Sequence, residues 1–97
     1  MTLTEKNAID HRLAAINARL SERYEMLDIN GESFFRTNSG TFFRVYAFPG
    51  EMALVIEYAD SESDAKLHRL EDGDRFYLED LSLDDMFKQM VSEIEGA

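Results

Sequence analysis

The sequence predicts a single α+β domain in which an antiparallel meander sheet of three to four strands carries an N-terminal and a C-terminal helix on one face. Three observations predict it. Apolar residues recur at helical spacing near both ends of the chain, aromatic and β-branched residues alternate through its centre, and turns with glycine separate the alternating segments. The 97 residues contain no repeat or linker, so one domain spanning residues 1–97 is expected.

The first helix is predicted to run from Thr4 to about Arg23, because apolar residues three or four positions apart mark one helical face. The residues of this face are Ile9, Leu13, Ile16, Leu20 and Tyr24. Asn30 and Gly31 then break the chain. The short segment 26–29 before them has no clear pattern, although extended backbone suits it.

Two strands, 34–37 and 41–48, are predicted on either side of a three-residue loop in which Gly40 is placed for a left-handed conformation. Pro49 and Gly50 are expected at the centre of a type II turn leading to a third strand, 52–58. This register pairs Phe35 with Phe43, Phe43 with Ile56 and Val45 with Leu54. One sheet face is then wholly apolar or aromatic, and it consists of Phe35, Phe43, Val45, Ala47, Met52, Leu54, Ile56 and Tyr58.

The remainder is expected to form a short helix, an edge strand and a final helix. Ser61 and Asp64 have the spacing of a capping box, a helical turn is expected at 65–70, and Gly73 is expected to end it. Residues 75–79 alternate enough for a strand, and Ser82 precedes a helical stripe of apolar residues. The two long helices are expected to cover the apolar face.

The opposite face of the sheet is less polar than a solvated face should be. In the same register it alternates aromatic rings with guanidinium groups, among them Phe34, Arg36, Phe42, Arg44 and Tyr46. Such rings and guanidinium groups stabilise a sheet by stacking on one another. The same composition is typical of an interaction surface, and a homodimer through this face is the simplest version.

The net charge of −10 belongs entirely to residues 49–97, because residues 1–48 contain equal numbers of acidic and basic side chains. A negative field attracts basic partners and repels nucleic acid and anionic membranes, although acidic surfaces also simply keep proteins in solution. We therefore expect a partner protein, but no nucleic acid and no membrane, since two arginines on the aromatic face do not offset the charge. The carboxylates expected to contact a basic protein are Glu71, Asp72, Asp74, Glu79 and Asp80.

The absence of cysteine removes disulfides and thiolate chemistry, which suits the reducing cytoplasm. The first residues have no signal-peptide pattern, and no apolar run is long enough to span a membrane. A cytoplasmic protein is therefore expected.

No residue pattern indicates catalysis, and we expect neither a cofactor nor an enzyme. Asp60, Glu62, Asp64 and Glu71 have the spacing of an EF-hand loop, but alanine stands where that loop needs glycine and the local signals favour helix. No metal is therefore expected. His11 and His68 have no partner at the spacing of a triad or of a metal pair.

The leading hypothesis is a small protein-binding module of the inhibitor, immunity or regulatory type, which acts through its surfaces. The alternative is a small-ligand binder or an unrecognised enzyme, with a pocket between sheet and helices. The residues expected to line that pocket are Tyr24, Tyr58, Met52, Met86 and Met90. A filled core would favour the module.

Overall fold

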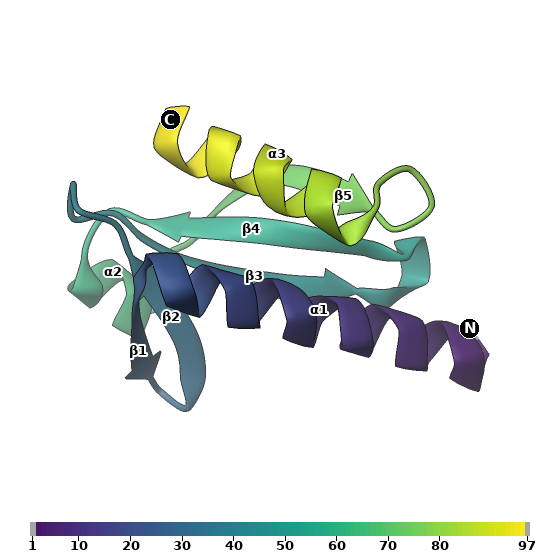
Figure 1. The fold of residues 1–97 in the computed structure, drawn as a ribbon. Helices are drawn as coiled ribbons and strands as arrows, with labels where there is room; N and C mark the ends of the chain where they lie inside the picture. The colour runs from purple at the N-terminus through teal and green to yellow at the C-terminus, as the bar shows by residue number, and fades with distance from the viewer. Residues whose placement is uncertain (1, 97) are drawn as a thin grey trace.

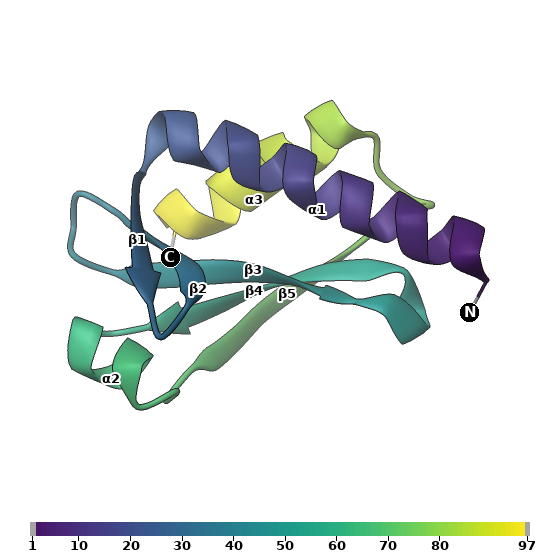
Figure 2. The same cartoon turned by 90° about the horizontal axis from the view of Figure 1, so that it is seen from below.

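The computed structural model describes residues 2–96, and it shows a five-stranded antiparallel sheet between two layers of helix. In chain order the elements are α1 (Leu3–Arg23), β1 (Glu25–Ile29), β2 (Glu32–Arg36), β3 (Phe42–Phe48), the 3-10 turn η1 (Pro49–Glu51), β4 (Ala53–Ala59), α2 (Glu62–Lys66), β5 (Glu71–Tyr77) and α3 (Leu83–Gly96). Each strand pairs with the next one along the chain. Helices α1 and α3 lie on one side of the sheet and α2 on the other (Figures 1 and 2).

The predicted α+β meander with a helix at each end is confirmed, but it has five strands. The additional strand is β1, which occupies the segment whose sequence showed no clear pattern. Asn30 and Gly31 adopt positive φ angles of 55° and 82°, so two residues suffice to turn β1 back onto β2. Asp28 accepts a hydrogen bond from the Gly31 N–H at 2.9 Å and stabilises the turn.

The register of the first predicted hairpin is confirmed, whereas that of the second is wrong by two residues. Phe35 lies opposite Phe43, and Gly40 has a φ of 90°. Val45, however, lies opposite Ile56 rather than Leu54, and Phe43 lies opposite Tyr58. The reason is that the chain makes a 3-10 turn in which Met52, at a φ of 51°, takes the left-handed conformation instead of Gly50.

A shift of two residues leaves every side chain on its predicted face, because strand side chains alternate with a period of two. The face towards α1 and α3 therefore forms the main core. Its fully buried members include Ile16 and Leu20 of α1 and Met86 and Met90 of α3. The apolar side chains predicted to line one face of the final helix thus pack against the sheet, as expected.

A second core lies on the other side of the sheet, and it corrects the expectation that the aromatic rings there are exposed. The side chains of Phe34 and Phe42 are only 1% and 6% exposed to solvent, because the short helix α2 and the end of β4 cover them. Ala65 of α2 packs in this cluster. The Asn30 side chain donates to the Lys66 carbonyl at 2.9 Å and joins α2 to the β1–β2 turn.

The end of α2 differs from the prediction. The helix stops at Lys66, and His68 rather than Gly73 adopts the left-handed conformation, with a φ of 58°. Gly73 lies within β5, where the side chains of Glu93 and Tyr58 come too close for any Cβ atom. Its role is close packing and not helix termination. Across residues 2–96, no helix has the length and apolar character needed to cross a membrane.

Candidate functional site: the surface around β5

The guanidinium groups predicted to form a contact surface are already bound within the chain. Arg36 pairs with Glu25, and Arg44 pairs with both Glu32 and Glu57. The Arg44 Nη2 atom lies 2.6 Å from the Glu57 carboxylate. With these partners in place, few of their hydrogen-bond donors remain for another molecule.

Two aromatic rings on the outer face of the sheet, those of Tyr46 and Phe48, are not covered by α2 and remain partly accessible. The Arg44 guanidinium lies 5.4 Å from the ring centre of half-buried Tyr46, and the Arg75 guanidinium 4.8 Å from that of Phe48. Val55 beneath them retains 1% of its exposure. Burial, with the nearby carboxylates of Asp72 and Glu57, raises the pKa of Tyr46 above its ordinary value. Guanidinium groups and rings therefore do stack on this face, although Phe34 and Phe42 are not among the stacked rings.

The five carboxylates predicted to contact a basic protein lie on and beside β5, and all five are exposed. None of them forms an ion pair within the described chain, residues 2–96. The acidic β5 surface, as we call it, consists of Glu71, Asp72, Asp74, Glu79 and Asp80. Its charge is therefore left for solvent or for a partner.

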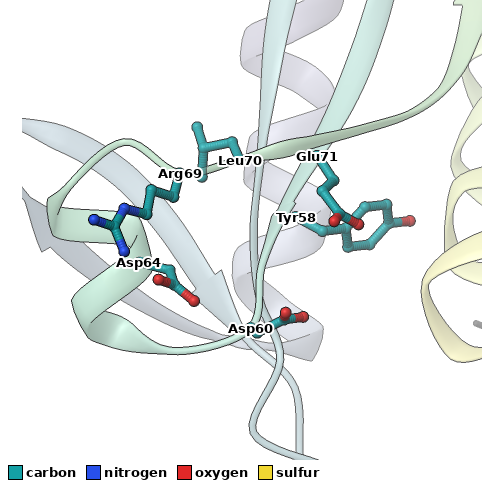
Figure 3. A pocket seen from close by; sticks show the side chains of 6 residues that line it. All are labelled: Tyr58, Asp60, Asp64, Arg69, Leu70 and Glu71. Carbon is teal, nitrogen blue, oxygen red and sulfur yellow. The ribbon is translucent and has the colours of Figure 1, made fainter.

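A hollow of about 300 Å³ adjoins the start of β5, between the end of β4 and α2 (Figure 3). Three carboxylates line it, those of Asp60, Asp64 and Glu71, together with one guanidinium, that of Arg69. Tyr58 and Leu70 complete the lining. Its dimensions and charge suit a single basic side chain, and it extends the acidic β5 surface towards α2.

Three residues of this hollow belong to the EF-hand-like spacing in the sequence. They are Asp60, Asp64 and Glu71, but the segment forms α2, in which the Ser61 hydroxyl accepts a hydrogen bond from the Asp64 N–H at 3.1 Å. Within residues 2–96, no three His, Cys, Asp or Glu side chains are grouped to hold a metal ion. Arg69 was not expected in the site, because only the folded chain brings it there.

A carboxylate clamp fixes α3 to the inner side of β5. The Tyr58 hydroxyl donates to Glu93 Oε2, while Glu93 Oε1 accepts the backbone N–H of Asp74 at 2.7 Å. Strands β4 and β5 shift register at this point, between Val55 and Glu57. The Glu93 side chain therefore satisfies a backbone group beside an irregularity of the sheet. Burial, followed by the contact with Glu93, raises the pKa of Tyr58 far above its ordinary value.

The side chains expected to line an internal ligand pocket fill space or hold contacts instead. Met86 and Met90 are fully buried in the main core. Tyr24 donates to Glu95 at 3.1 Å, just as Tyr58 donates to Glu93. Hollows of about 360 and 300 Å³ lie beside the β2–β3 loop at the surface. His11 and His68 are both exposed, on α1 and after α2.

Comparison of the chain with models of protein families, with curated proteins and with solved structures found no match.

Proposed function

We propose that the protein is a cytoplasmic protein-binding module, of the inhibitor, immunity or regulatory type, that docks a basic segment of another protein on the acidic β5 surface without catalysis. The observation that carries this proposal is that all five carboxylates of this surface are exposed and without an ion pair in the described chain.

The distribution of cations supports a partner of positive charge. Seven of the ten Lys and Arg side chains form ion pairs within residues 2–96, and none of these pairs involves the acidic β5 surface. Neighbouring carboxylates repel one another, and a basic segment relieves that repulsion on binding. The same field accelerates the encounter with a basic protein.

The hollow beside α2 supports an extended basic segment in particular. One Lys or Arg side chain of the partner enters between Asp60, Asp64 and Glu71, and the following residues lie along β5 towards Glu79. The filled main core supports this mode of action over the alternative of an internal ligand pocket.

The proposal is tested with a fluorescent oligolysine peptide, whose binding is followed by anisotropy at low and at high salt. We compare the double variant Asp72→Asn, Glu79→Gln with Asp10→Asn, Glu22→Gln, which removes the same two charges from α1. The first variant should weaken binding roughly tenfold, at up to about 1 kcal/mol for each exposed charge. The second should change it by less than about twofold, because its charges lie away from the contact.

Equal weakening by both variants would mean that only the net charge matters, and it would contradict a defined surface. Failure of the wild-type protein to bind the peptide at low salt would contradict the proposal outright.

A further inference from the structure

The two free edges of the sheet, β1 and β5, differ in how they are protected. Exposed edge strands invite pairing with another chain, and folded proteins block them with charges, bulges or covering elements. Strand β5 has all three: exposed carboxylates, a shift in register opposite Gly73 and Asp74, and the Glu93 side chain bound to the Asp74 N–H. A further strand does not add readily to such an edge.

Strand β1 is less protected: it carries two exposed carboxylates, Glu25 and Asp28, but its pairing with β2 has no shift in register. All five of its residues pair regularly with β2, from Glu25 opposite Arg36 to Ile29 opposite Glu32. It contains no proline, glycine, lysine or arginine. Met26 is 55% exposed, one of the most exposed large apolar side chains among residues 2–96. The β1 edge is therefore a regular, partly apolar template for another strand.

We propose that β1 is the interface of a homodimer, in which the β1 strands of two copies pair in antiparallel orientation and the two sheets become continuous. The partner is a second copy of this chain because the backbone of β1 is complementary to itself in antiparallel orientation, and one register keeps its two carboxylates from facing each other.

The backbone geometry selects the register. A two-residue turn closes on a hydrogen-bonded pair, here Ile29 and Glu32, so alternate residues Leu27 and Glu25 also bond within the hairpin. Met26 and Asp28 therefore direct their N–H and C=O groups to the free edge. The register with the fullest overlap pairs Met26 of one copy with Asp28 of the other, and it places Leu27 opposite itself.

The charges permit this register and oppose the alternative centred on Asp28. With Leu27 at the centre, Glu25 lies opposite Ile29 of the second copy, and no two carboxylates lie directly opposite each other. Glu25 is also paired with Arg36 of its own chain. A register centred on Asp28 would place two carboxylates face to face.

The position of β1 in the molecule favours the same assembly. It lies in the half of the sequence whose acidic and basic residues balance, whereas β5 lies in the half that carries the whole net charge. Because β1 and β5 are opposite edges of the sheet, pairing through β1 places the two acidic β5 surfaces at the far ends of the dimer. The inference goes beyond the proposed function, since it concerns the opposite edge.

Sedimentation velocity over a range of protein concentrations tests the dimer with two opposite substitutions of one exposed residue. Met26→Glu puts a carboxylate opposite Asp28 of the second copy and should weaken dimerisation roughly tenfold or more. Met26→Lys puts an ammonium group there and should leave the dimer as strong or stronger. The control Leu3→Glu, at an exposed apolar residue on α1, should have no effect.

A monomer at all concentrations would overturn the proposal, and so would a dimer that Met26→Glu leaves intact. Circular dichroism verifies that each variant is folded. A dimer broken instead by Tyr46→Ser would place the interface on the outer sheet face and would also refute the β1 assignment. Salt separates this test from that of the proposed function, since salt weakens peptide binding but not pairing between two acidic chains.

Discussion

Gly73→Ala should destabilise the fold more than its small size implies. A Cβ atom at this position would lie 2.6 Å from Glu93 Oε2 and 2.8 Å from Tyr58 Cε2. Real side-chain atoms do not approach so closely, so the Glu93 carboxylate must leave its place. It then loses the Tyr58 hydroxyl and the Asp74 N–H together.

The magnitude follows from those two contacts. Hydrogen bonds to a charged group contribute about 1.5 to 3 kcal/mol each, and the half-buried position of the clamp places them towards the lower value. Loss of both, partly offset by solvation of the freed carboxylate, should lower the free energy of unfolding by about 2 to 3 kcal/mol. For a domain of this length the melting temperature should fall by roughly 10 °C or more.

The assay is thermal and urea unfolding of Gly73→Ala beside the matched control Gly50→Ala. Nothing lies within 4 Å of a Cβ at Gly50, and its φ is not in the left-handed region, so the control should be neutral or slightly stabilising. If the two variants melt within about 1 °C of each other, the clamp is not a stabilising contact. Glu93→Ala should also reduce the cost of Gly73→Ala, because the carboxylate that the new Cβ displaces is then absent.

Three further predictions concern other parts of the fold. Tyr58 has a raised pKa in the folded chain, so it keeps its proton at a pH at which the unfolded chain, with its ordinary pKa of 10.0, releases it. The free energy of unfolding should therefore fall as the pH rises past 10.0. Urea unfolding at alkaline pH should show a smaller fall for Tyr58→Phe. Phe34→Ala should cost about 3 to 5 kcal/mol in the same assay, because it empties the second core under α2; a cost below about 1 kcal/mol would show that α2 does not cover the ring. Thr2→Ala should cost about 1 kcal/mol, measured as a lower melting temperature, because Thr2 and Glu5 form a capping box at the start of α1.

Face assignments could be predicted from the sequence because they depend only on parity. The Val45 prediction was wrong in partner but right in face, since the 3-10 turn shifted β4 by an even number of residues. The stripes of α1 and α3 were equally secure, because each repeats over several turns of helix. Turn conformations were predicted less well, since Met52 and not Gly50 adopts the left-handed conformation.

The cover over Phe34 and Phe42 could not be located from the sequence. The rings on the outer face were interpreted as a stacked layer or as a contact surface for another molecule, whereas α2 of the same chain covers two of them. The sequence did not predict a strand at residues 26–29, because a five-residue strand without aromatic residues has no distinct pattern of its own. Its pairing with β2 comes from the tight turn at Asn30 and Gly31.

The candidate site was predictable in its charges and not in its geometry. The five carboxylates around β5 stand out in the sequence because few basic residues accompany them. Arg36 and Arg44 were expected to be available, yet their carboxylate partners Glu25, Glu32 and Glu57 lie on neighbouring strands and become visible only with the register. The hollow of Asp60, Asp64 and Arg69 depends on the path of the chain around α2.

The central claim is that β5, and not the molecule's charge as a whole, receives a basic segment. Amide chemical shifts of the isotope-labelled protein, recorded while oligolysine is added, test it most directly. The largest changes should fall on residues 71–80 and around the hollow at Asp60 and Asp64, with α1 and β1 unaffected. Changes spread evenly over the exposed acids of α1 and β5 would contradict the claim.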